Sequence, residues 1–218
     1  MNKKEFENLL AHLPRDPGIL GREDYFNPAV LIPFVEMPDG YHILFEVRAK
    51  HIPQGGEVCF PGGRYQPGMD SSLMDTALRE ASEELGIVKD KIEILGRTDA
   101  VVSPYLMIVD AFIGIIKIES LGDIKPDPME VECVFTIPVE FFRNNPPEVY
   151  QGVLCSHPCA IDGPDEGSVL FPAKELGLPE RYTKPWGKQR YNIYYYRTDP
   201  PVWGITARFI KDLIDKMG

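Results

Sequence analysis

The chain has few basic residues for its acidic content. It contains 23 Lys and Arg against 33 Asp and Glu among 218 residues, which gives a formal net charge of −10 at pH 7. Affinity for phosphate backbones comes mainly from clustered Lys and Arg that release counterions, so this composition argues against a nucleic-acid polymer as a partner. A small anionic substrate bound through a metal ion is still compatible with it.

Cysteines are few, and long apolar runs are missing. The four cysteines, Cys59, Cys133, Cys155 and Cys159, include no C-x-x-C pair, and residues 155–159 lack a second ligand pair at zinc-finger spacing. No apolar run is long enough for a transmembrane helix, and the N-terminus lacks an apolar signal core. We therefore expect a cytoplasmic, reduced protein with no membrane segment.

The hydrophobic pattern predicts one domain behind an N-terminal helix. We assign residues 1–25 to an amphipathic helix with its linker, and residues 26–218 to the domain. The helix is expected from Lys3 to Leu13, with its apolar face packed against the rest of the protein.

Mixed secondary structure is expected in the domain. Strands are predicted at 29–36 and 41–48 around a Pro-Asp-Gly turn, and at 92–95, 100–102, 105–118 and 191–197. Helices are predicted at 139–144 and 206–217. Residues 146–187 are rich in Pro and Gly without clear periodicity, which indicates a long loop or insertion that covers a site.

Residues 62–87 are the most informative part of the chain. A helix from Ser72 to Leu85 would put Glu80, Glu83 and Glu84 on one polar edge, where like charges repel. A divalent cation such as Mg²⁺ or Mn²⁺ would offset this repulsion, because hard cations take carboxylate oxygens as ligands. The apolar stripe facing the core would then be Met74, Ala77, Leu78, Ala81 and Leu85.

A run of acidic residues on a helix is usually only a solvent-exposed face. Here the flanking residues favour a binding site instead. Gly62 and Gly63 allow a backbone to approach a ligand closely, and Gly86 suits the left-handed end of a helix. Arg79 precedes Glu80 and can orient the carboxylates by bidentate hydrogen bonds without touching the metal.

The segment from Arg79 to Ile87 resembles a known catalytic motif. Its sequence, Arg-Glu-Ala-Ser-Glu-Glu-Leu-Gly-Ile, is similar at every fixed position to the REUxEExGU core of the Nudix hydrolases. Gly62 and Gly63 stand where that motif begins, although the loop before the helix is longer than usual. The first glutamate of the motif falls on Ser71, with Asp70 one position earlier.

This resemblance implies a fold and a reaction. The fold is an α/β/α sandwich with a mixed β-sheet, and the reaction is hydrolysis of a phosphoanhydride in a nucleoside diphosphate linked to another group. Metal ligands would be Glu80, Glu83, Glu84 and the carbonyl of Gly63, or of Gly62. A box glutamate or a more distant carboxylate would act as general base. Glu130 is the candidate for the distant one, against an equal expectation that it is an ordinary exposed residue.

A narrower resemblance is to the Nudix subgroup that acts on coenzyme A. The segment Phe60 to Gly63 reads Phe-Pro-Gly-Gly, Gly56 lies four residues before it, and Arg48 lies further upstream. This similarity implies that coenzyme A or acyl-coenzyme A is split into 3′,5′-ADP and (acyl-)4′-phosphopantetheine. The extra 3′-phosphate requires a basic partner, for which Arg48 and Lys50 are the candidates.

The sequence is also compatible with other functions. The substrate of a Nudix enzyme could instead be ADP-ribose, NADH or a nucleoside triphosphate. The chain could also be a binding module that keeps the fold without catalysis, although the intact glutamates argue against this. In each case the expected partner is a small nucleotide, and the sequence leaves monomer and homodimer equally open.

Overall fold

A hairpin forms the centre of the fold. The computed structural model describes residues 1–16 and 18–218. Strands β1 (Pro28–Met37) and β2 (Gly40–Arg48) pair antiparallel around a turn that ends at Gly40, where a φ of 124° favours glycine. Both strands are largely buried, as their dense Val, Ile, Leu and Phe content predicts. The predicted hairpin is confirmed.

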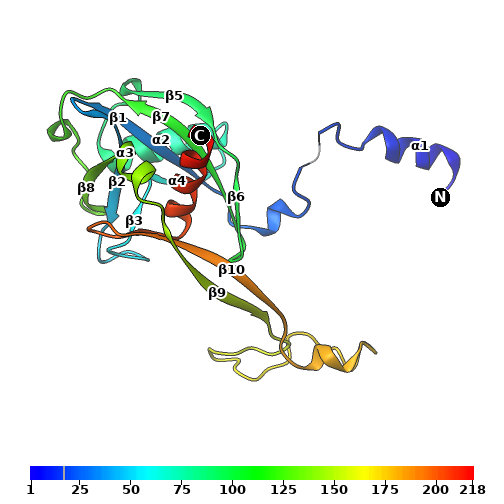
Figure 1. The fold of residues 1–218 in the computed structure, drawn as a ribbon. Helices are drawn as coiled ribbons and strands as arrows, with labels where there is room; N and C mark the ends of the chain where they lie inside the picture. Colours follow the sequence, from blue (N-terminus) through cyan, green and yellow to red (C-terminus); the bar gives the residue numbers. More distant parts are fainter. Residues whose placement is uncertain (17) are drawn as a thin grey trace.

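Six further strands extend this hairpin into a mixed eight-stranded sheet (Figure 1). The order is β3-β2-β1-β7-β5, with β4 on β1, β6 on β7 and β8 on β2. The β1–β7 pair is parallel, whereas β1 runs antiparallel to β2 and β4. The added strands are β3 (Val58–Cys59), β4 (Gly62–Arg64), β5 (Ile92–Arg97), β6 (Val101–Ser103), β7 (Met107–Ile116) and β8 (Val131–Pro138).

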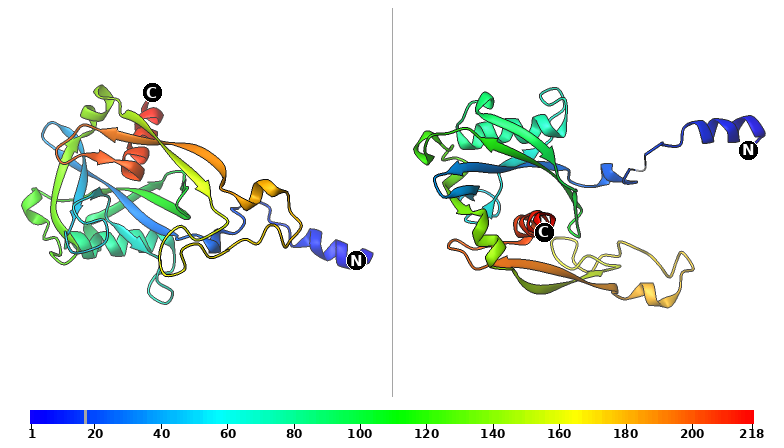
Figure 2. Two further views of the ribbon diagram at one scale, coloured as in Figure 1. Left: turned by 90° about the horizontal axis from the view of Figure 1, so that it is seen from below. Right: turned by 45° about the horizontal axis from the view of Figure 1, so that its top comes forward.

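Helices cover both faces of the sheet (Figure 2). Helix α2 (Leu73–Leu85) packs on one face, where Leu31 and Leu44 join its core. Helices α3 (Val139–Asn144) and α4 (Gly204–Met217) pack on the other, against Ile32 and Ile43. Neighbouring residues of β1 and β2 thus point to opposite faces, as the two-residue period of a strand requires. The predicted α/β/α sandwich is confirmed.

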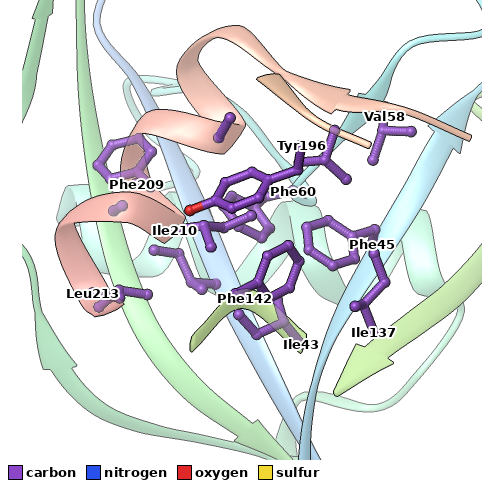
Figure 3. Close-up of a cluster of buried hydrophobic side chains, with 14 of the residues drawn as sticks. Ile43, Phe45, Val58, Phe60, Ile137, Phe142, Tyr196, Phe209, Ile210 and Leu213 are labelled. Atoms are coloured by element: carbon purple, nitrogen blue, oxygen red, sulfur yellow. The ribbon is translucent and has the colours of Figure 1, made fainter. Parts of the chain in front are cut away.

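The α4 face holds the larger core. Phe209, Ile210 and Leu213 of α4 belong to the same buried cluster as Ile43 and Phe45 of β2 (Figure 3). All five side chains are at least nine-tenths buried. Because the C-terminal helix closes this core, residues far beyond the β-sheet contribute to the stability of the same folded unit.

The ends of α2 agree with the sequence prediction. The hydroxyl of Ser72 accepts from the amide of Asp75 at 3.1 Å, and Gly86 adopts the left-handed conformation at the other end. A Cβ at Gly86 would lie 1.8 Å from the carbonyl oxygen of Lys125, so only glycine fits there. The expected burial of Met74 is wrong: it is 42% exposed, and Thr76 points inward in its place.

The segment 146–187 differs from the expected loop. Strand β9 (Glu148–Ser156) pairs antiparallel with β10 (Trp186–Tyr196), and β11 (Val202–Trp203) completes a second, three-stranded sheet. This hairpin is an arm that projects from the domain on the side of α4 and does not cover α2 (Figures 1 and 2). Most side chains of β9 and of the first part of β10 are exposed or only partly buried, so these strands lack the apolar alternation by which strands are recognised. The predicted strand at 191–197 is confirmed as the end of β10, where Tyr196 enters the main core.

The N-terminal helix also differs from expectation. Helix α1 (Lys3–Ala11) begins at a capping box formed by Asn2 and Glu5, but none of its residues is buried. It stands away from the domain (Figure 1). The predicted helix is therefore present, whereas its predicted packing is wrong for the structure of this single chain.

All four cysteines are free thiols. Sγ of Cys155 donates to the carbonyl of Trp186 at 3.3 Å, which is a local contact within the arm. In the part of the chain that the structure describes, every helix is too short or too polar to cross a bilayer.

Candidate active site

Arg79 organises the acidic residues of α2. Its side chain is only 6% exposed. Nε and Nη2 donate to the two carboxylate oxygens of Asp70 at 2.8 and 3.0 Å. Nη1 donates to Glu83 at 3.0 Å, and Nη2 pairs with Glu80 at 2.8 Å. One planar guanidinium thus sets the positions of three carboxylates, a task for which Arg is better suited than Lys.

Asp70, one position before the place of the motif's first glutamate, is the carboxylate that pairs with Arg79. Its carboxylate is 1% exposed and also accepts from the amide of Gln66 at 2.9 Å and the hydroxyl of Thr76 at 3.0 Å. These bonds, with Arg79 the strongest, hold the pKa of Asp70 well below its usual range. The hydroxyl of Ser71 instead bonds Asp75 at the surface.

Glu84 is buried, unlike an ordinary helix-surface glutamate. It is 5% exposed and accepts from the amide of Gly62 at 2.7 Å. Burial is the main cause that raises its pKa to about 9, and the charges of Glu46, Glu80 and Glu130 add to the effect. Burial likewise raises the pKa of Glu80.

Glu46 belongs to this cluster and was missed by the sequence analysis. It lies on β2 and is 1% exposed. Burial raises its pKa to about 7, with Glu130 and Glu80 adding to the rise and Arg48 and the thiol of Cys59 opposing it. The available signal was a single acidic residue inside the apolar run Ile43 to Val47, where a strand buried on both faces normally has none.

Glu130 and Gly63 both lie near glutamates of α2. Glu130 is exposed, in a loop that packs on the end of α2, since the amide of Asp127 donates to the carbonyl of Glu84 at 3.0 Å. Its charge is one of those that raise the pKa of Glu84. At Gly63, a Cβ would lie 2.5 Å from the carboxylate carbon of Glu80, so glycine lets this carboxylate lie against the backbone.

These residues fit a hard divalent cation, although they do not close around one point. No group of three or more His, Cys, Asp or Glu side chains in ranges 1–16 and 18–218 forms a ready ligand set. Arg79 draws Glu80 and Glu83 toward itself, and the Gly62 amide holds Glu84. The donor atoms are nevertheless carboxylate and carbonyl oxygens, which hard divalent cations prefer as ligands, and the side chains of Glu80 and Glu84 are largely shielded from solvent.

A cavity of about 360 Å³ opens beside the cluster. Its lining includes Gly62 and Cys59, which contact Glu84 and Glu46, together with Arg48 and the aromatic side chains of Tyr105 and Trp203. Lys50 does not accompany Arg48: its side chain is 80% exposed and pairs with Glu132 at 2.8 Å. Of the two predicted phosphate partners, the cavity therefore brings in Arg48 alone.

Replacing Arg79 by Lys tests its role in orienting the carboxylates. The charge stays, but the fork that reaches Asp70, Glu80 and Glu83 is lost. We expect kcat to fall by about ten- to a hundredfold, the usual cost of removing a group that positions ligands, with little change in KM. Steady-state kinetics check this. A large increase in KM at unchanged kcat would place Arg79 on the substrate instead.

The family follows from comparison with known proteins. The model of the NUDIX domain matches residues 26–149, from the start of β1 to the start of β9. This stretch contains Arg79, Asp70, the helix glutamates and the glycines around which the site is built. The chain belongs to the Nudix family, which confirms the assignment and the fold class predicted from the sequence.

Three curated relatives illustrate the range of the family. The chain is 34% identical to Nudix hydrolase 3 of Caenorhabditis elegans, over 63% of this chain and 59% of that protein. It is 30% identical to the mitochondrial Nudix hydrolase 15 of Arabidopsis thaliana, over 93% and 61% respectively. It is 32% identical to the peroxisomal coenzyme A diphosphatase NUDT7 of Mus musculus, over 56% and 50%. The matches thus span about half to three fifths of each relative.

Proposed function

We propose that this protein hydrolyses the diphosphate bond of a nucleoside diphosphate linked to another group, with coenzyme A or acyl-coenzyme A as its substrate. The observation that supports the reaction most is the buried Arg79–Asp70 pair, which holds Glu80 and Glu83 beside Glu84 next to a cavity. In the proposed reaction, water attacks one phosphorus and the bridging oxygen leaves with the other, which gives two phosphate esters.

The proposed reaction assigns a role to each of the candidate site residues. Glu80, Glu83, Glu84 and the Gly63 carbonyl would hold Mg²⁺ or Mn²⁺, with Arg79 fixing the first two carboxylates. The bound ion would polarise the diphosphate and lower the pKa of the attacking water. Glu130, on its exposed loop, would accept the proton of that water.

Sequence similarity and the lining of the cavity both support coenzyme A as the substrate. The Phe-Pro-Gly-Gly segment and the similarity to a coenzyme A diphosphatase favour it. The cavity is lined by Arg48 and by aromatic side chains, which suit a phosphate and an adenine.

We also infer that residues 26–218 act as one domain, since α4 completes the core of the sheet, and that residues 1–25 form a separate helix and linker.

A substrate screen tests the function directly. Purified protein is incubated with Mg²⁺ or Mn²⁺ and coenzyme A, acyl-coenzyme A, ADP-ribose, NADH or a nucleoside triphosphate, and the products are separated by chromatography. Dominant 3′,5′-ADP and 4′-phosphopantetheine support the proposal. Preference for ADP-ribose, NADH or a triphosphate supports the alternative pyrophosphatase. No turnover of any compound supports a binding module.

The 3′-phosphate provides a finer test. If Arg48 binds it, coenzyme A should exceed dephospho-coenzyme A in kcat/KM by about ten- to a hundredfold, as for a charge-assisted hydrogen bond of about 1.5 to 3 kcal/mol. Arg48→Ala should erase that difference. Lys50→Ala is the matched control, because its ammonium pairs with Glu132 outside the cavity and the preference should persist. Equal rates on both substrates in the unmutated protein would contradict a dedicated 3′-phosphate site.

A further inference from the structure

Glu46 has an unsatisfied carboxylate oxygen inside the protein. Oε1 accepts from the thiol of Cys59 at 3.2 Å, but Oε2 has no partner. Among the described residues, Oε2 is the one buried side-chain oxygen or nitrogen without a hydrogen bond. Leaving a buried polar group unpaired is costly, and more so when the group is charged, so this oxygen requires an explanation.

Strand geometry directs this carboxylate toward the Nudix helix. Along β2, Ile43 and Phe45 belong to the core under α4, whereas Leu44 belongs to the core under α2. Glu46 lies two residues after Leu44, so its side chain leaves the sheet on the α2 face. Its neighbour in register on β8, Val134, also packs on that face.

On this face, Glu46 meets the buried end of α2. Glu46 lies close enough to Glu84 for its negative charge to raise the pKa of that carboxyl, in addition to the effect of burial. The amide of Gly62 donates to Oε2 of Glu84, and Gly62 follows Cys59 closely in the chain. The short segment 59–62 therefore contacts both carboxylates, one through a thiol and the other through an amide.

We propose that Glu46 is an additional ligand of the divalent cation bound at Glu84, with the unpartnered Oε2 facing the ion and the Cys59 thiol holding Oε1 in place. The inference rests on the proposed function, because it adds a ligand from the sheet to the cation site of the helix. A divalent cation satisfies this carboxylate oxygen better than a neutral hydrogen-bond donor does, because it carries the opposite charge and prefers hard oxygen ligands.

Direct binding of Mn²⁺ provides the test. Glu46→Gln keeps the size of the side chain and removes its charge, so the Kd for Mn²⁺ measured by isothermal titration calorimetry should rise by about tenfold or more. The rise in melting temperature that Mn²⁺ causes should shrink. The melting temperature without metal should stay equal or increase, because one of two neighbouring buried carboxylates no longer carries charge. Glu36→Gln, on an exposed position of β1, removes the same charge and should change neither property.

The thiol supplies a second pair of variants. Cys59→Ala removes the donor to Oε1 and should weaken Mn²⁺ binding, whereas Cys59→Ser restores a donor and should recover it. This pair decides the question if Glu46→Gln does not fold. Unchanged Mn²⁺ affinity in Glu46→Gln, or equal affinity in both Cys59 variants, overturns the assignment. If Glu84→Gln alone loses Mn²⁺, Glu46 is not a ligand and the proposed function stands. If neither glutamate variant changes binding, the cation site itself is wrong.

Discussion

Glu84→Gln is expected to lower turnover by about a thousandfold or more, the scale on which a principal electrostatic group contributes to catalysis. Glutamine keeps the shape of the side chain and can still accept from the Gly62 amide, so the local structure should survive. What is lost is the negative charge that a cation requires. The measurement is kcat with saturating Mg²⁺ or Mn²⁺ on the best substrate of the screen.

A melting curve without metal separates this loss from misfolding. Burial and the neighbouring carboxylates already disfavour the charged form of Glu84, so neutral Gln in its place should leave the melting temperature unchanged or slightly higher. Glu36→Gln, with the same loss of charge at an exposed site, should keep full turnover. An active Glu84→Gln protein would show that the cation site is placed on the wrong residues.

Asp70→Ala is expected to destabilise the protein by about 3 kcal/mol, because it leaves the buried guanidinium of Arg79 without its bidentate partner. It also removes the acceptor for the Gln66 amide and the Thr76 hydroxyl. Glu80 and Glu83 lose the support of a fixed Arg79, so kcat should fall by about ten- to a hundredfold. Urea unfolding without metal gives the change in the free energy of unfolding.

A double-mutant cycle isolates the pair. Arg79→Met removes the buried charge that Asp70→Ala leaves unpaired, so the double variant should be less destabilised than the sum of the single variants. Additive losses would mean that Asp70 stabilises the loop before α2 through its other bonds and not through Arg79. Ser71→Ala serves as the neighbouring control, since Ser71 is exposed and its hydroxyl bonds only Asp75.

Local elements were predictable because their signals are local. Ser72 and Gly86 mark the ends of α2 by capping chemistry that depends on a few neighbouring residues. The hairpin of β1 and β2 follows from dense apolar residues around a Pro-Asp-Gly turn. The spacing of Glu80, Glu83 and Glu84 likewise puts them on one edge of a helix, whatever surrounds that helix.

The burial of side chains and the contacts between distant segments could not be predicted from the sequence in the same way. Strand β9 and the first part of β10 are largely exposed, so no buried face imposes a pattern there, whereas the end of β10, which carries the buried Tyr196, was predicted as a strand. Met74 has the right helical spacing for the core but is exposed, whereas Thr76 is buried and its hydroxyl donates to Asp70. The side chain of Lys50 reaches Glu132 on β8, a partner that strand pairing brings beside it.

By itself, the sequence determined the family motif, the helix that contains it, the α/β/α class and the acidic edge on which a cation site is proposed. These depend on spacing along the chain, which the backbone geometry of a helix or strand converts directly into direction. Only the tertiary structure decided that Asp70 pairs with Arg79, that Arg48 rather than Lys50 lines the cavity, and that Glu46 lies near Glu84. Each of those choices depends on which distant surfaces meet and exclude water, and charge in a buried place behaves differently from the same charge in solvent.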